Sequence, residues 1–110
     1  MPVSTAEGPR IVTVFRNRLR PDAAEQYAPL AAEMSRLAHA MPGFVDSSYF
    51  TSADGERVTI VTFADRASHD AWRNHDLHRA AQQRGIDEFY ETYSIQVSEE
   101  TYSHVFVRPS

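Results

Sequence analysis

Cysteine is absent from this 110-residue chain, and its absence excludes several classes of site. Without a thiol the chain can form no disulfide framework, no thiolate nucleophile and no cysteine-based zinc or iron–sulfur centre. Long apolar runs are also missing, and no stretch approaches the roughly 20 residues that a membrane helix needs. The formal net charge of −4 argues against a nucleic-acid surface. We therefore expect neither a nucleic acid nor a membrane among its partners.

The composition is that of an ordinary globular domain, with 42% hydrophobic and 24% charged residues. Residues 1–9 are rich in small and polar side chains and lack the basic and apolar regions of a signal peptide. From these features we expect a flexible N-terminal segment over 1–9, a single domain over 10–110, and a cytoplasmic location.

Hydrophobic periodicity predicts an alternation of strands and helices along the chain. Period-two patterns predict strands over 10–19, 44–52, 57–63, 89–97 and 101–108. Apolar steps of three and four residues predict one helix over 23–41, and the later stretch up to about residue 83 favours a second. This order predicts an α+β, ferredoxin-like βαββαβ fold with an extra C-terminal strand.

Two helices cover only one face of such a sheet. Apolar residues nevertheless occur at both alternating positions of the predicted strands: Val12, Val14, Val45, Tyr49, Val61 and Phe63. A second apolar face needs a partner, and a twofold stacking of sheet on sheet is the simplest solution. The sequence therefore predicts a homodimer.

The stretch from Ala71 to Gln82 concentrates side chains that suit a binding site. It contains the only tryptophan, Trp72, followed by His75 and His78. In one continuous helix these residues and Gln82 fall within about 120° of Trp72. Two interpretations stay open at this point: a binding face, or polar residues exposed beside a buried indole.

The two histidines of this stretch are three residues apart, a spacing that also permits metal binding. No carboxylate shares their face, and the His-Glu-x-x-His pattern is absent. We therefore expect no metal site.

Several groups of residues follow the layout of a known family. They are Ala-Met-Pro-Gly-Phe at 40–44, Asp-Gly-Glu at 54–56, Trp72 with His75 and His78, and Phe89-Tyr90. In this arrangement the chain resembles the antibiotic biosynthesis monooxygenase (ABM) family, from about residue 10 to residue 107. The resemblance implies a dimeric α+β barrel with a cleft between the helices and the sheet.

Two branches of that family imply different chemistry. The cofactor-free branch oxidises polycyclic phenols with dioxygen and has the helical tryptophan, an asparagine four residues before it and a tyrosine six residues after it. Here Trp72 matches, while Ser68 and His78 occupy the other two positions. The haem-degrading branch has an asparagine late in the first strand, which Asn17 matches, and a haem-ligating histidine at the position of Gln82. Glutamine is not a normal axial ligand of haem.

The resemblance thus favours a cofactor-independent monooxygenase, an oxidoreductase that acts on a flat aromatic substrate of phenolic or polyketide type. Asn17, Trp72 and His78 are the expected catalytic residues, since imidazole can replace a tyrosine in acid–base chemistry. Phe15, His75, Gln82 and Tyr93 are expected around the substrate. A haem-binding or haem-degrading protein and a non-catalytic ligand-binding dimer are the alternatives.

Overall fold

The computed structural model describes residues 8–110, so most of the N-terminal segment predicted over 1–9 lies outside the described residues. The elements follow one another as β1 (Ile11–Leu19), α1 (Ala24–Ala40), β2 (Phe44–Thr51), β3 (Arg57–Phe63), α2 (Arg66–Arg73), α3 (Asp76–Arg84), the π-helical turn η1 (Gly85–Phe89) and β4 (Tyr90–Glu99). The predicted α+β, ferredoxin-like order is confirmed.

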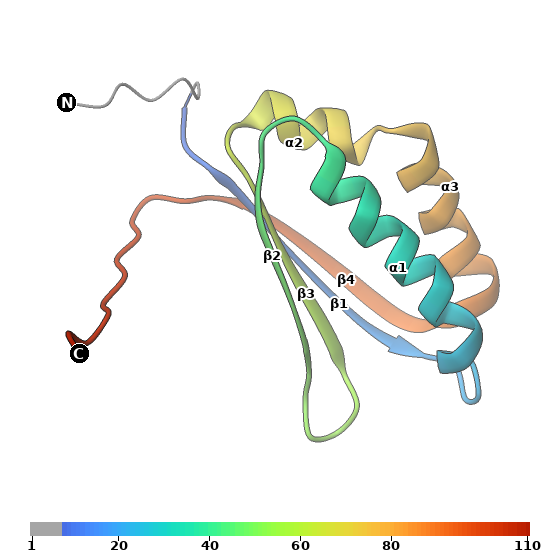
Figure 1. The fold of residues 1–110 in the computed structure, drawn as a ribbon. Helices are drawn as coiled ribbons and strands as arrows, with labels where there is room; N and C mark the ends of the chain where they lie inside the picture. Colours follow the sequence, from blue (N-terminus) through green and yellow to red (C-terminus); the bar gives the residue numbers. More distant parts are fainter. Residues whose placement is uncertain (1–7) are drawn as a thin grey trace.

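The four strands form one antiparallel sheet in the order β2-β3-β1-β4. The helices pack on one face of this sheet (Figure 1). Alternation along β1 directs Thr13, Phe15 and Asn17 toward the helices, and all three line the space beneath them. The register places Asn17 opposite Arg57 of β3 on one side and Tyr93 of β4 on the other.

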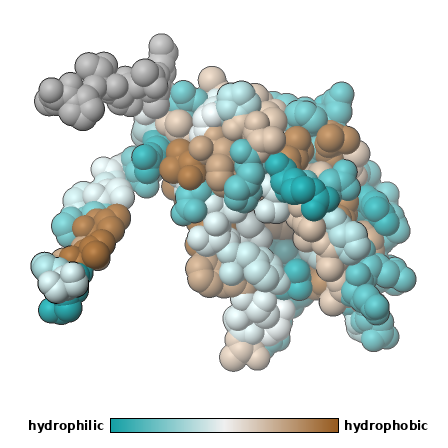
Figure 2. Space-filling model, in the orientation of Figure 1, coloured by the Kyte–Doolittle hydropathy of each residue, from teal (hydrophilic) through white to brown (hydrophobic). Residues whose placement is uncertain are grey.

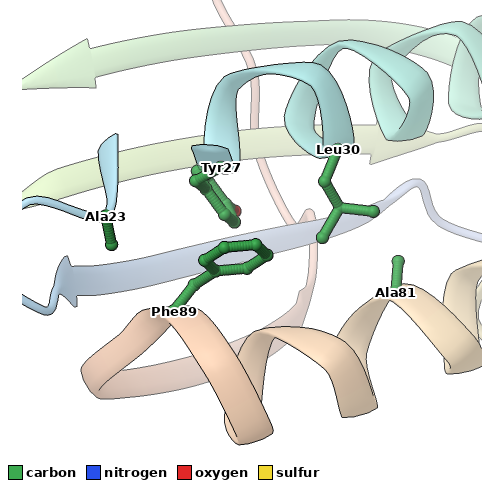
Figure 3. Close-up of a cluster of buried hydrophobic side chains, with 5 residues drawn as sticks. All are labelled: Ala23, Tyr27, Leu30, Ala81 and Phe89. Carbon is green, nitrogen blue, oxygen red and sulfur yellow. The ribbon is translucent and has the colours of Figure 1, made fainter. Parts of the chain in front are cut away.

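Two apolar clusters hold the helices on the sheet. One joins Tyr27 and Leu30 of α1 to Phe89 of η1, with Ala23 and Ala81 alongside, and these side chains point toward one another (Figure 3). The rings of Tyr27 and Phe89 meet edge to face, with centroids 5.5 Å apart. The second cluster joins α1, β3 and α2 and contains Ala38, Val61, Phe63 and Trp72.

The helix predicted to continue through residue 83 is broken in two. Asn74 ends α2 with φ −91° and ψ 1°, and His75 is extended and caps α3. The His75 imidazole accepts a hydrogen bond from the Leu77 amide, with Nδ1 3.1 Å from the nitrogen. Neither Gly nor Pro is needed for the break, because a side-chain acceptor satisfies an amide at the new helix start. The angles expected from one continuous helix are therefore wrong beyond Asn74.

Gly85 does not end the helical segment. Its φ is −58°, an ordinary helical value, and the chain continues through the π-helical turn η1. What Gly85 supplies is space, since a Cβ at this position would collide with the ring of Tyr90.

The strand predicted over 101–108 does not form. The pairing of β4 with β1 ends at Glu99 opposite Ile11, and the following residues have no helix or strand assignment. Figure 2 shows this segment apart from the globular body, with apolar side chains near its end. Tyr102, Val105, Phe106 and Val107 are all exposed. Among residues 8–110 the alternating sequence has no neighbouring strand with which to pair, and a strand needs such a neighbour.

The sheet face away from the helices is partly apolar. The outward positions of β1 and β3 include Val12, Val14, Val58 and Ile60, all partly exposed. Val61 and Phe63 occupy the other alternating position of β3, face the helices and are buried. The outer face of β1 and β3 thus contains four branched apolar side chains.

We accordingly expect a homodimer with an interface above about 1,200 Å². Light scattering at micromolar concentration should give twice the mass of one chain. Val14→Glu should halve that mass, because it places a charge at the centre of the apolar face. Ala24→Glu, at the exposed start of α1, introduces the same charge away from this face and should leave the dimer intact. A monomer mass for the unaltered chain contradicts the prediction.

Candidate functional site

A cavity of about 440 Å³ lies between the helices and the inner face of the sheet. The sheet contributes Phe15, Asn17 and Arg57 to its lining. The helices contribute apolar residues of α1 together with His69, Trp72, His78 and Gln82. The volume falls within the range of pockets that hold small organic ligands.

Unpaired polar atoms are concentrated in this cavity. Within residues 8–110, five buried side-chain atoms have no hydrogen-bond partner in the protein: Thr13 Oγ1, Asn17 Oδ1, Arg57 Nε, His69 Nε2 and Trp72 Nε1. All five residues line the cavity. Buried polar groups in native proteins are nearly always paired, so unpaired ones that share a cavity indicate a ligand site.

Trp72 is a fixed wall of the cavity. It lies on α2, whose start is secured by a capping box in which the Asp65 carboxylate accepts from the Ser68 amide at 2.9 Å. The indole stacks on Phe63 with ring centroids 5.1 Å apart and an interplanar angle of 28°. Its N–H has no partner in the protein and can donate to a ligand.

His78 reaches the cavity from α3, with its ring centroid 4.4 Å from that of Trp72. Its Nδ1 lies 3.3 Å from the backbone carbonyl of Arg73. A carbonyl can only accept, so Nδ1 carries the hydrogen in the neutral ring and Nε2 keeps its lone pair. Burial lowers the pKa of His78 below its ordinary value, which favours the neutral form that can accept a proton.

His69 is a second imidazole in the cavity, and it was not predicted from the sequence. It is 1% exposed, and its Nδ1 lies 2.9 Å from Oδ1 of Asp70. Its Nε2 is buried without a partner. A histidine three residues before Trp72 on a capped helix shares the face of the indole, and this spacing was the available signal.

The remaining predicted residues divide into two groups. Phe15 and Gln82 line the cavity. His75 and Tyr93 are not among its lining residues: His75 caps α3, and Tyr93 is 45% exposed and packs against the rings of Phe15 and Tyr90. Arg57, Tyr27 and Tyr90 also line the cavity, and neither Arg57 nor Tyr27 was assigned to the site from the sequence.

In the part of the chain that the structure describes, no group of three or more His, Asp or Glu side chains is placed to hold a metal ion. Within the same residues, 8–110, no helix combines the length and apolar character needed to cross a membrane.

Comparison with known proteins agrees with this architecture. The family model for antibiotic biosynthesis monooxygenase matches residues 10–84, and the chain therefore belongs to this family. An uncharacterized protein of Bacillus subtilis, YqjZ, is 29% identical over 94 residues, which cover 86% of this chain and 82% of that protein.

Solved structures share the fold at low sequence identity. Rv0793 from Mycobacterium tuberculosis superposes with a TM-score of 0.78 at 20% identity, covering 87% of this chain and 99% of that one. SnoaB, a cofactor-independent oxygenase from Streptomyces nogalater, gives a TM-score of 0.73 at 14% identity, covering 87% of this chain and 97% of that one.

The lowered pKa of His78 predicts a pH dependence of stability. The unfolded chain takes up a proton near the ordinary value of 6.5, whereas the folded chain does so only at lower pH. The unfolded state thus binds more protons between these values, so the free energy of unfolding should decrease as the pH falls below 6.5.

Urea unfolding at about pH 7.5 and about pH 5.5 measures this loss. His78→Gln should reduce the difference between the two conditions. His104→Gln, in the exposed segment after β4, should leave it unchanged. If the free energy of unfolding differs between the two pH values by the same amount in His78→Gln and in the unaltered protein, His78 is not the source of the pH dependence.

Proposed function

We propose that this protein is a cofactor-independent monooxygenase that oxidises a flat phenolic substrate with dioxygen. The observation that carries the proposal is the cavity itself, in which an indole wall and five unpaired polar atoms surround a space of small-molecule size. Family membership and the fold shared with a cofactor-independent oxygenase support the same chemistry.

The proposed reaction needs no electron donor other than the substrate. Removal of the phenolic proton gives an electron-rich anion, and a ring carbon of this anion forms a bond to dioxygen. The peroxide then loses the hydrogen of that carbon while its O–O bond breaks, which leaves a quinone carbonyl and releases water. One oxygen atom enters the product. The other leaves as water with the proton that the base returns, and the substrate supplies all four electrons that reduce dioxygen.

The cavity residues have separate tasks in this scheme. Trp72 provides a rigid surface for stacking and one N–H donor. Asn17, 3% exposed at the end of β1, holds the oxyanion or the peroxide oxygen by hydrogen bonding through its amide. His78 accepts the phenolic proton, because its lowered pKa keeps the ring neutral near pH 7.

His69 gives the scheme a second possible base. An imidazole whose Nδ1 faces a carboxylate has a fixed orientation and presents Nε2 as the acceptor, an arrangement widely used in acid–base catalysis. The rings of His69 and His78 both lie beside Trp72, with centroids 6.0 and 4.4 Å from the indole. Variants at the two positions therefore have to be compared on one substrate.

We expect His78→Phe to lower turnover by roughly 10²–10⁴-fold, the usual contribution of a general acid–base group. Oxygen uptake and quinone absorbance with 1,8-dihydroxyanthrone or 1-naphthol measure the rate. His75→Asn is the matched control, since asparagine retains the helix cap and removes an imidazole that does not line the cavity. Its rate should equal that of the unaltered protein.

The outcomes of this comparison separate the assignments. If His78→Phe keeps its rate and His69→Asn loses it, the proton goes to His69 instead. If both variants retain activity, neither imidazole is the base. If the unaltered protein consumes no oxygen with any flat phenol, the monooxygenase proposal itself fails.

Haem is the alternative ligand of the same fold. Gln82 lines the cavity at the position where the resemblance implies a ligating histidine, and its amide is a poor partner for haem iron. Titration with haemin should therefore give no saturable Soret band. A saturable band that His78→Phe or His69→Asn removes would establish haem binding in place of phenol oxidation.

A further inference from the structure

Arg57 presents a cation to the cavity without an acidic partner. It begins β3 on the face covered by the helices and is partly buried there. Its Nε is buried and has no hydrogen-bond partner, and no ion pair involves it within residues 8–110. Removing a charge from water is costly unless an opposite charge or hydrogen bonds replace the lost hydration.

The nearest acidic residues in the sequence are already engaged. Glu56 lies 3.7 Å from Nε of Arg16, and Asp54 lies 2.7 Å from an amino nitrogen of Arg18. Arg16 and Arg18 occupy the outward positions of β1, so these ion pairs form on the other side of the sheet from the cavity. Arg57 therefore has no counter-ion among its neighbours in sequence.

Two aromatic rings hold the guanidinium in place. Its central carbon lies 5.4 Å from the ring centroid of Tyr27 on α1 and 5.0 Å from that of Tyr49 on β2. Contacts of this kind orient a guanidinium but leave its N–H groups free to donate. A planar fork of N–H donors is the geometry that matches a carboxylate oxygen pair.

A tyrosine pair adds a further donor beside Arg57. The hydroxyl oxygens of Tyr27 and Tyr90 are 3.0 Å apart, and both residues line the cavity. Burial raises the pKa of Tyr90, so its hydroxyl keeps its proton. Two hydroxyl protons and one mutual hydrogen bond leave one O–H available to a ligand.

We propose that Arg57 and this tyrosine pair form a subsite for an anionic oxygen group of the flat ligand. This subsite narrows the substrate class from phenols in general to acidic aromatics. Turnover of such a substrate rests on the proposed function, whereas its binding to the cavity does not. The anionic group is either a carboxylate on the ring system or an ionised enol of a quinone-like ring. Both present oxygen lone pairs to the same donors.

Binding to the unaltered protein tests the subsite without any turnover. Quenching of the fluorescence of Trp72, the only tryptophan, reports occupancy of the cavity. The probes are 2-naphthoate with its neutral amide for a carboxylate, and 2-hydroxy-1,4-naphthoquinone with its methyl ether for an ionised enol. We expect the anion of at least one pair to bind roughly tenfold or more tightly than its neutral partner.

Arg57→Gln should abolish this preference while binding of the neutral probe stays unchanged. Arg57→Lys keeps the charge but loses the planar fork, so it should retain part of the preference. Arg16→Gln is the matched control, because it removes the same charge from the outward face of the neighbouring strand. It should leave all four affinities unchanged.

Three results would overturn the proposal. The first is equal affinity for the anionic and neutral members of both pairs in the unaltered protein. The second is an equal loss of affinity for the anionic and the neutral probe in Arg57→Gln, which indicates a packing role for the arginine. The third is an undiminished preference in that variant. If Arg57→Gln does not fold by circular dichroism, the probe pairs on the unaltered protein and Arg57→Lys decide the question.

An anion preference together with no oxygen uptake would support the subsite and refute the oxygenase. Oxygen uptake with neutral phenols and no anion preference would support the oxygenase and refute the subsite.

Discussion

The pairing of β1 between β3 and β4 is the constraint on which the site depends. Antiparallel register places Asn17 beside Arg57 and Tyr93, and period-two alternation then decides which of their neighbours face the helices. A shift of one residue along β1 would turn Asn17 and Phe15 to the outer face and bring Arg16 beneath the helices. The buried face of this strand therefore fixes both the core and the polar lining of the cavity.

The cavity persists because the apolar contacts are divided between two clusters. One cluster is built around Tyr27, Leu30 and Phe89, the other around Phe63 and Trp72. Side chains that join α1, η1 and α2 to the sheet at separate places support the helices without filling the space between them. Polar atoms that would be costly in a closed core are tolerated there, because a ligand can pair with them.

Much of this arrangement could be predicted from the residues. Alternation located β1 and β3 closely, and the three-and-four spacing located α1, because each pattern reflects burial on one face of a local element. Asn17, Trp72, His78, Phe15 and Gln82, the residues to which the sequence assigned catalytic or substrate-binding roles, all line the cavity. Arg57 was missed because a lone arginine in a sequence gives no sign of whether its side chain has a partner. His69 was missed although its spacing of three residues from Trp72 places it on the face of the indole.

The sequence by itself determined the order of elements, the family and the face on which Asn17 lies, because these depend on local periodicity and short motifs. Only the tertiary structure decided that the helix breaks at Asn74 and His75, that residues 101–108 form no strand, and which polar atoms remain unpaired. Each of these depends on a contact or on the lack of one: an imidazole that accepts from the Leu77 amide, a neighbouring strand to pair with, a carboxylate beside an arginine. Such contacts join residues through space, and the linear order of the chain does not specify them.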